Sequence, residues 1–418
     1  MRPNTTWLLF VVTLMLVTTG IVMVYSSSAA IAKRDERVAK MRAQKEALKN
    51  SDKTLANDPR FQAAATPSLD EDEDNSLHSF TYLQRQAIFT LLGIIGLLVA
   101  YRVDYEHYRK LAVPLLVVSF IALLLVYVPG VGSGAKGARR WIGLGLFKIQ
   151  ASEVAKLAMV IYMAHQLNVR QKDLKYFFRG FLPMMGLLGV FMLAIVAEPD
   201  LGACIVLGGI CFTMWFVAGM RPIHLATLFI LAIPAAILAI LIEPFRVQRI
   251  IAFMNPEDKE LIRGSGYQLY QSLIAVGSGG LSGLGLGEGP QKYLFLSEAY
   301  TDFIFAVICE EFGLIGATII IALYVFFVVQ GIRVASHAPD LYSCLLATGA
   351  TAMIGIPAFF NMAVVTGLVP TKGLGLPLVS YGGSSLIINM VAIGILMNVS
   401  RFVEITAATP RRVRASFA

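Results

Sequence analysis

Charged side chains are scarce in this chain. Of its 418 residues only 15% are Asp, Glu, Lys or Arg, whereas 56% are hydrophobic, and the mean hydropathy is +0.68. A typical soluble domain carries about 25% charged residues. The shortage of charge excludes an ordinary soluble domain and indicates that a lipid bilayer surrounds most of the chain.

Cysteine is scarce as well, and no Cys-x-x-Cys pair occurs. All four cysteines lie in apolar runs, which is typical of small packing residues. Their spacing excludes a disulfide framework and a thiolate metal site. These residues are Cys204, Cys211, Cys309 and Cys344.

The sequence has no signature of nucleic-acid or nucleotide binding. The net charge is +8, but no compact basic domain with interleaved aromatic residues occurs, so we expect no nucleic-acid partner. The glycine-rich stretch 277–289 is not followed by the Gly-Lys-Ser/Thr of a P-loop. In a membrane protein the positive charge is expected on the cytoplasmic loops.

Long apolar runs are abundant. A membrane span needs about 20 apolar residues, and backbone exposed to lipid must be helical. The pattern predicts an all-α polytopic membrane protein, a single domain over 1–418, with ten transmembrane helices. We expect these helices at 7–27, 86–101, 111–129, 152–168, 180–197, 201–219, 224–243, 303–332, 342–366 and 385–400.

The distribution of Lys and Arg predicts that both termini are cytoplasmic. In that orientation every inner loop carries at least one cation, and the tail 401–418 is basic, as the positive-inside rule expects. The first apolar run is longer than that of a signal peptide, which favours a retained anchor. We therefore expect a multi-pass protein of the cytoplasmic (inner) membrane.

The first outer segment, 28–81, is long and rich in both signs of charge. Residues 33–49 have the mixed charges of an exposed helix, and 70–74 are all acidic. A contact with a partner protein is one interpretation, but composition favours a solvated segment.

Two other outer segments carry cations where topology disfavours them. The short segment 130–151 has four cations and no acid, and the largest outer loop, 244–302, between the seventh and eighth helices, has five. An anionic ligand at the outer surface would explain both. The cations are Lys136, Arg139, Arg140 and Lys148 in the first segment, and Arg246, Arg249, Lys259, Arg263 and Lys292 in the second.

Asp302 is the sharpest candidate for chemistry. It stands directly before the apolar run 303–308, which puts a carboxylate at the outer end of a long helix. A helix cap is one interpretation, and a general base is the other. The glycines of 277–289 allow two interpretations as well, a re-entrant loop or an anion site built from backbone amides.

Charged residues inside the spans have functional and structural interpretations. Glu153 and Lys156, three residues apart on one helix face, favour a structural ion pair. Glu310 and Glu311 lie in the same helix that follows Asp302. The irregular segment 367–385 cannot continue a helix, and such backbone at a membrane edge predicts a cavity that opens outward.

Six motifs stand in order along the chain: GARRWI at 137–142, QASE at 150–153, EPDLG at 198–202, GYQ at 266–268, EAYTDF at 298–303 and SYGGSS at 380–385. Together they resemble the SEDS family (shape, elongation, division and sporulation), and its division members most closely. The resemblance covers nearly the whole chain outside 28–80. Departures are Ser297 and Tyr300 for Pro and His, Ala151 for Pro, and Glu198 for Gln.

The resemblance implies a peptidoglycan glycosyltransferase that polymerises lipid II outside the membrane, beside a class B penicillin-binding protein and other divisome proteins. It implies Asp302 as catalytic base and Arg140 with Lys148 on the lipid diphosphate. A divalent cation could screen the diphosphate, but no ligand cluster demands one, so no metal site is assigned and no cofactor is required. Further predicted substrate contacts are Arg246, Gln268, Lys292, Lys372, Ser380, Tyr381 and Ser384.

Two other functions remain open on the sequence. A flippase or transporter of a lipid-linked precursor would use the cavity and the buried charges, and would give Asp302 no chemical role. A division scaffold without chemistry of its own would tolerate the replacement of Asp302 by Asn.

Overall fold

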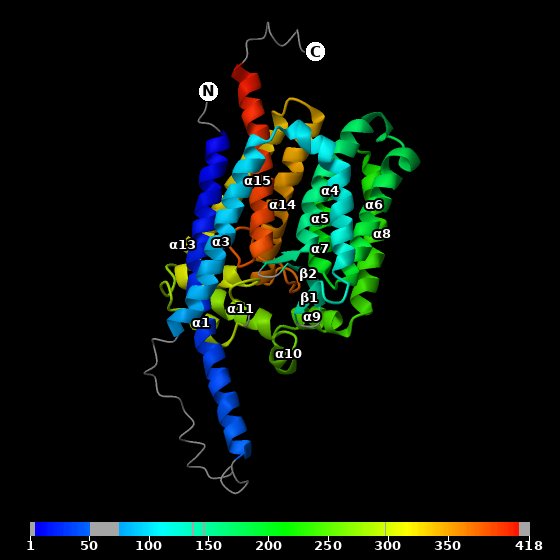
Figure 1. The fold of residues 1–418 in the computed structure, drawn as a ribbon. Coiled ribbons are helices and arrows are strands. Elements are labelled where there is room, and N and C mark those ends of the chain that lie inside the picture. Colours follow the sequence, from blue (N-terminus) through cyan, green and yellow to red (C-terminus); the bar gives the residue numbers. More distant parts are fainter. Residues whose placement is uncertain (1–4, 51–74, 136–137, 145–146, 297, 409–418) are drawn as a thin grey trace.

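The computed structural model describes residues 5–50, 75–135, 138–144, 147–296 and 298–408. Ten helices of at least 16 residues dominate this part of the chain, and each coincides with one of the predicted apolar segments (Figure 1). They are α1 (Thr5–Asn50), α3 (Asn75–Arg102), α4 (Tyr105–Leu125), α5 (Ala151–Val169), α6 (Leu182–Ala197), α7 (Leu201–Val217), α8 (Pro222–Leu241), α13 (Ile304–Ser336), α14 (Leu341–Val365) and α15 (Gly383–Ala408).

Shorter elements connect these helices. Several helices begin at an aspartate whose side chain accepts a backbone N–H, as at Asp104, Asp200 and Asp340, which satisfies donors that the first turn leaves free. The short elements are β1 (Gly132–Ala135), β2 (Ala138–Leu144), β3 (Phe147–Gln150), η1 (Gln171–Asp173), η2 (Phe177–Phe181), α9 (Pro244–Met254), α10 (Lys259–Arg263), α11 (Tyr267–Ser278) and α12 (Gln291–Leu294).

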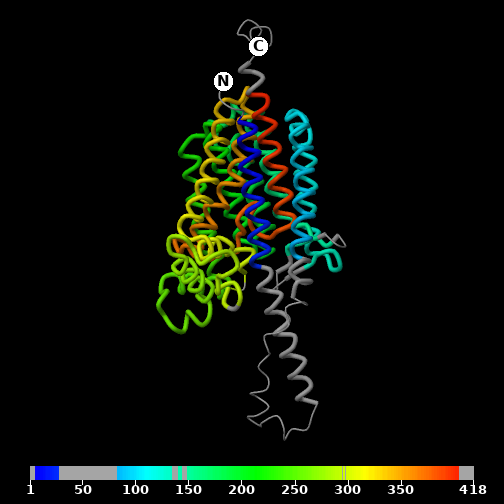
Figure 2. Tube along the Cα trace, turned by 90° about the vertical axis from the view of Figure 1, so that its left-hand side faces the viewer, coloured from blue at the N-terminus to red at the C-terminus, as the bar shows by residue number. Residues whose placement is uncertain are grey.

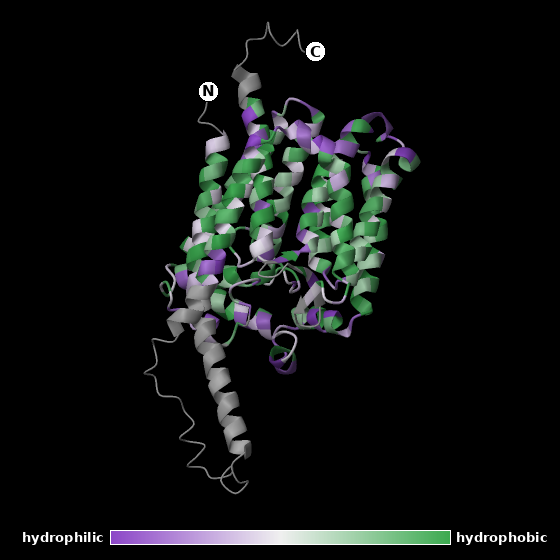
Figure 3. Cartoon of the chain, in the orientation of Figure 1, coloured by the Kyte–Doolittle hydropathy of each residue, from purple (hydrophilic) through white to green (hydrophobic). Residues whose placement is uncertain are grey.

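Eight helical segments of the described chain are long and apolar enough to cross a membrane, and α7 is a shorter apolar helix. Figure 3 shows hydrophobic residues along the helices and polar residues gathered at the two ends of the bundle. This confirms a mostly helical, polytopic membrane protein. That all ten helices cross the bilayer stays a prediction.

Helix α5 lacks an apolar lipid-facing surface because other helices surround it. It packs against α4, α7 and α14, and 13 of its residues are buried. Since the protein interior replaces lipid as its environment, α5 can carry the ion pair of Glu153 and Lys156, whose charged atoms lie 2.8 Å apart. The pair joins two residues of one helix, and its structural role stays a prediction.

The bundle has two distinct ends. The start of α1 and the end of α15 lie at one end, and the sheet and α9 to α11 lie at the other, which we call the loop end (Figure 1). Turned by 90°, Figure 2 again shows the segment 244–302, green to yellow, opposite the end of α15. The outer segments of the predicted topology therefore share one end of the molecule.

The all-α prediction missed a small sheet. Strands β1, β2 and β3 form an antiparallel sheet in that order, within the segment 130–151. The prediction considered only backbone exposed to lipid, which must be helical. At the end of the bundle the strands can pair with one another, so the restriction does not apply.

Helix α13 is interrupted at Gly313, whose φ of 62° lies outside the helical region. The glycine-rich stretch runs beside the break: the amides of Leu284 and Gly285 donate to the carbonyls of Glu310 and Glu311, each at 3.0 Å. A Cβ on Gly283 would overlap the Glu311 carbonyl. These amides donate to carbonyls of the interrupted helix. The contacts therefore favour the interpretation of 277–289 as a re-entrant loop over that of an anion site.

Parts of two predicted segments lie outside the described residues. Within 28–81, α1 continues to Asn50 and α3 starts at Asn75, and the acidic run 70–74 falls between them. The last ten residues of the basic tail, 409–418, are also outside the described chain.

Candidate functional site

Asp302 lies in the turn that leads into α13, and α14 holds its backbone. The Asn361 amide nitrogen donates to the Asp302 carbonyl at 2.7 Å and to the Leu374 carbonyl at 2.6 Å. Asn361 is buried. One side chain thus ties the turn before α13 to the irregular segment that follows α14.

The same two segments meet at further points. The Ser380 hydroxyl donates to the Thr301 carbonyl at 2.5 Å and accepts from the Leu376 amide at 2.7 Å, and the Tyr381 amide donates to the Tyr300 carbonyl at 2.9 Å. Ser380 and Tyr381, predicted as substrate contacts, therefore hold the backbone of the two residues that precede Asp302. The two strongest motifs of the sequence lie together for this reason.

The Asp302 side chain lies against Gly373. A Cβ built on Gly373 would come within 3.0 Å of Asp302 Oδ2. Any larger residue at that position would therefore crowd the carboxylate. The close approach explains why glycine suits the position after Lys372.

Lys372 brings positive charge to this region. Burial lowers the pKa of Lys372 to about 8, the neighbouring Arg246 and Arg249 lower it further, and Asp200 opposes the shift. The guanidinium of Arg246 also donates to the Ala239 carbonyl at 2.6 Å, which ties α9 to the end of α8.

Arg249 links these cations to Asp302. Burial lowers the pKa of Arg249, Arg140 adds to the shift, and the Asp302 carboxylate opposes it. The Arg249 guanidinium donates to the Thr371 carbonyl at 3.4 Å and lies 4.4 Å from the ring centre of Phe245. Arg249 therefore faces the segment that carries Lys372.

Arg140 reaches the cluster from the sheet. Its guanidinium donates to the Glu198 carbonyl at 3.2 Å and to the Pro199 carbonyl at 2.7 Å, in the turn between α6 and α7. Gln150, at the end of β3, donates to an Asp200 oxygen at 3.3 Å. The sheet is thus fastened to the turn 198–200.

Glu198 is the least satisfied group of the site. Its side chain is buried, and neither carboxylate oxygen has a hydrogen-bond partner in the described part of the chain. Burial raises the pKa of Glu198 to about 8, Asp200 adds to the shift, and Arg140 opposes it. At neutral pH the carboxyl is therefore mostly protonated and uncharged, as the glutamine that the resemblance implies at this position would be.

Together these residues form what we call the loop-end cluster. It contains four cations and three carboxylic acids, one of which is mostly neutral at pH 7. The excess of positive charge suits an anionic ligand such as a diphosphate. The members of the cluster are Arg140, Glu198, Asp200, Arg246, Arg249, Asp302 and Lys372.

Lys148 and Arg140 differ in their places in the sheet. Lys148 pairs with Gly143 across β2 and β3 and is exposed. Arg140 is the extra residue at an irregularity in the register of β1 and β2, where Ser133 pairs with Trp141 and Gly134 pairs with Arg139. Our proposal for the diphosphate rests on Arg140 and leaves Lys148 as a prediction.

The remaining predicted contacts lie in different surroundings. Gln268 is half-buried on α11, and Ser384 accepts from the Gln150 amide at 3.2 Å. Lys292 is paired with Glu311, and the side chains of both are 0% exposed. Direct contact between Lys292 and substrate is incompatible with that burial, so this assignment is corrected.

Sequence reasoning did not assign Arg249, Asn361, Glu198 or Asp200 to the site. Arg249 could have been found, since it lies three residues after Arg246 and so on the same face of α9. Glu198 and Asp200 lie within a recognised motif. Asn361 carries no local signal, because its role depends on two backbone segments that only folding brings together.

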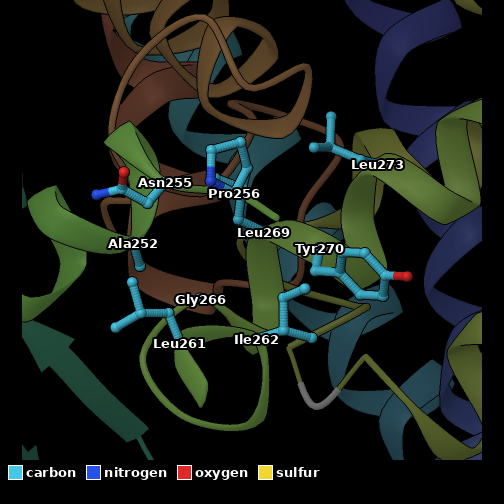
Figure 4. A pocket seen from close by; sticks show the side chains of 9 residues that line it. All are labelled: Ala252, Asn255, Pro256, Leu261, Ile262, Gly266, Leu269, Tyr270 and Leu273. Carbon is cyan, nitrogen blue, oxygen red and sulfur yellow. The ribbon is translucent and has the colours of Figure 1, made fainter. Parts of the chain in front are cut away.

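None of the residues of the loop-end cluster lines the pocket in Figure 4. Mainly apolar side chains from α9, α10, α11 and their connections line it, Leu261, Leu269 and Leu273 among them. These side chains pack the elements of the large loop against one another. Within the described residues no group of three or more His, Cys, Asp or Glu side chains is placed to hold a metal ion.

Comparisons with known proteins show the family of this chain. Residues 64–405 match the family model FtsW/RodA/SpoVE, described as cell cycle protein. A probable peptidoglycan glycosyltransferase FtsW of Geobacter metallireducens is 46% identical over 321 residues, 77% of this chain and 85% of that protein. Stage V sporulation protein E of Bacillus subtilis is 40% identical over 395 residues, 94% of this chain and 96% of that protein.

Solved structures are similar as well. A chain of a peptidoglycan synthase complex, described as coordinating polymerization and crosslinking, has a TM-score of 0.66 and 28% identity, covering 77% of this chain and 90% of that one. The rod shape determining protein RodA of Thermus thermophilus has a TM-score of 0.61 and 26% identity, covering 94% and 96%. This multi-pass membrane protein therefore belongs to the FtsW/RodA/SpoVE family of cell cycle proteins.

Proposed function

We propose that this chain is a peptidoglycan glycosyltransferase that polymerises lipid II during septal cell-wall synthesis. The observation that carries the proposal is that Asp302 lies against Gly373, next to Lys372, while Arg249 donates to the Thr371 carbonyl of the same segment. Relatives named as peptidoglycan glycosyltransferases support it.

The reaction joins a sugar hydroxyl to an anomeric carbon whose leaving group is a lipid diphosphate. The C–O bond to the acceptor forms as the bond to the diphosphate breaks, and the diphosphate leaves with the electron pair. Asp302 accepts the proton of the acceptor hydroxyl, a role that typically contributes about 10²–10⁴ in rate. Asn361 and Ser380 hold the backbone from which Asp302 projects.

The cations of the cluster stabilise the departing diphosphate. Arginine offers a planar fork that matches phosphate oxygens, and lysine offers a point charge. Arg140 and Arg249 supply forks from β2 and α9, and Lys372 supplies the point charge. Because the cluster lies partly out of water, each charge acts more strongly there than at an open surface.

The proposal includes an orientation and a partner. With cytoplasmic termini, the loop end faces the outside of the cytoplasmic (inner) membrane, where Asp302 meets lipid II. The partner is a class B penicillin-binding protein, together with other divisome proteins. The similarity to a chain of a peptidoglycan synthase complex supports this choice.

The test uses purified full-length chain in vesicles with lipid II, with and without a class B partner. We expect glycan polymer in the presence of the partner. Vesicles with lipid II on the inner leaflet only separate this function from that of a flippase, which would move substrate without polymerising it. No polymer under any of these conditions would favour a flippase or a scaffold.

We expect no obligatory metal ion. A chelator should leave at least part of the polymer yield, and added Mg²⁺ should raise it only by screening the diphosphate. Complete loss of polymer with the chelator, restored by Mg²⁺, would contradict this expectation.

The KM for lipid II should rise with pH because of Lys372. The Lys372 ammonium, with a pKa of about 8, is charged below pH 7 and mostly neutral at pH 9. The KM should stay constant below pH 7 and increase by up to about tenfold at pH 9, since one pH unit above the pKa leaves about one tenth of the lysine charged. Initial rates of polymerisation at several lipid II concentrations measure this.

Two variants control the pH experiment. Lys372→Arg keeps its charge and should show a smaller rise in KM than the wild type, because Glu198 alone then titrates near this range. Glu198→Gln removes that second group, so the rise that remains in this variant is the part caused by Lys372. An equal rise in Lys372→Arg would show that another group is responsible.

A further inference from the structure

A second charged cluster lies inside the protein near the break in α13. The Lys292 ammonium is paired with the Glu311 carboxylate, and both side chains are 0% exposed. Ser26 of α1 completes the pair: its hydroxyl accepts from Lys292 at 2.7 Å and donates to the Glu311 oxygens at 2.8 and 3.1 Å. Three elements, α1, α12 and α13, meet at these three side chains.

The residues just before Lys292 and Glu311, Gln291 and Glu310, are also in contact. The amide of Gln291 donates to a Glu310 oxygen at 3.2 Å. Residues 291 and 292 therefore dock onto residues 310 and 311 side by side. The carbonyls of the same two glutamates accept the amides of Leu284 and Gly285, so α13 is held just before its break at Gly313 through both side chains and backbone.

The chain between the two docked points carries the proposed base. Asp302 lies ten residues after Lys292 and nine residues before Glu311, near the middle of a loop that the ion pair closes. On the other side, Asn361 and Ser380 hold residues 301 and 302. The position of Asp302 is thus set from the irregular segment after α14 and from the ends of its own loop.

Stability alone does not explain a buried ion pair. Removing two charges from water is costly, and apolar replacements of buried pairs are often neutral or stabilising. An ion pair with a hydroxyl between its partners does impose one geometry, since each atom must meet its donor or acceptor. The geometry fixed here is that of the loop around Asp302.

We propose that the Lys292–Glu311 pair, completed by Ser26, positions Asp302 for glycosyl transfer. This inference rests on the proposed function. Lys292, Glu311 and Ser26 are positioning residues: they act through the loop and touch no substrate. Their loss should lower the turnover of bound substrate and leave its binding nearly unchanged.

The main test is the double variant Lys292→Met/Glu311→Gln, which removes the pair without leaving an unpaired charge. Its kcat should fall at least about tenfold, since a displacement of about 1 Å can cost about 10²-fold. Its KM for lipid II should stay within about twofold, because the cations of the loop-end cluster are untouched. Polymerisation kinetics and thermal unfolding in the same detergent are measured for each variant.

Two further variants accompany it. Ser26→Ala leaves both charges paired and should fold, with kcat lower by about threefold at unchanged KM. Tyr105→Phe is the matched control, since it removes a partly buried hydrogen bond of 2.7 Å to Asp340 at the opposite end of the bundle. It should lower the unfolding temperature without changing kcat.

The outcomes separate the inference from the proposed function. Wild-type chain that makes no polymer would overturn the function itself. Active wild-type chain with an equally active double variant would overturn only the positioning role. If the double variant fails to fold, Ser26→Ala decides: wild-type kcat overturns the inference, and a selective loss of kcat supports it.

Discussion

Replacement of Asp302 by Asn should abolish glycan polymerisation while the protein remains folded. Asparagine keeps the shape of the side chain and removes the proton acceptor. The Asn361 contact survives because it uses the Asp302 backbone carbonyl. We expect turnover to fall by about 10²–10⁴, the usual contribution of a placed base. Polymer yield from lipid II in vesicles with the class B partner measures the loss.

The Asp302→Asn variant needs two controls. Its amount in the membrane and its unfolding temperature should match those of the wild type, and lipid II should still bind. Robust polymer synthesis by this variant would remove Asp302 as the base and favour the transporter or scaffold. A variant that neither folds nor binds lipid II would indicate that the carboxylate is structural.

Replacement of Arg249 by Ala should have the second-largest effect. Arg249 interacts with the Asp302 carboxylate and donates to the segment of Lys372. Its loss therefore removes one cation from the proposed diphosphate site and one positive charge near the proposed base, Asp302. A hydrogen bond to a charged group contributes about 1.5–3 kcal/mol, which corresponds to about 10–150-fold in kcat/KM. Arg249→Lys should retain part of the activity, because it keeps the charge without the fork.

A matched control for Arg249 lies in the same loop. Arg263, at the end of α10, is exposed, so Arg263→Ala removes one positive charge from the loop end without touching the loop-end cluster. It should keep near-wild-type kcat/KM. If both alanine variants lose activity equally, the effect is one of overall charge, and Arg249 has no specific role.

Glu198, the buried glutamate of the loop-end cluster, shows how a glutamate can replace a glutamine without changing the charge of the site. The resemblance to the family implies glutamine where this chain has Glu198. Burial and the neighbouring Asp200 raise the pKa of Glu198 to about 8, so near neutral pH the carboxyl is mostly uncharged. The positive excess of the cluster is therefore kept, which explains why a glutamate is tolerated beside a proposed diphosphate site.

Hydropathy predicted the helices because lipid imposes a local rule. Every lipid-exposed backbone amide needs a partner within its own segment, so a run of about 20 apolar residues has one solution. The segment 342–366 became α14 (Leu341–Val365), and 152–168 became α5 (Ala151–Val169). The rule says nothing about polar segments outside the bilayer, and there the three-stranded sheet was missed.

The motifs identified the segments that form the site, but not all their roles. Asp302, Arg140, Arg246 and Lys372 were assigned from the sequence and lie in the loop-end cluster. Lys292, from the same loop, was assigned to substrate and is instead buried against Glu311. The local sequence around a cation in an outer loop does not distinguish a substrate contact from a buried ion pair.

Local chemistry therefore specified the class of protein, the helices and the residue types available at one end of the bundle. Folding decided which of those residues meet, because the contacts join positions far apart in sequence. Asn361 reaches Asp302, Ser26 reaches Glu311, and Arg140 reaches the turn at Glu198. Each pairing depends on how helices pack side by side, which hydropathy along the chain does not encode.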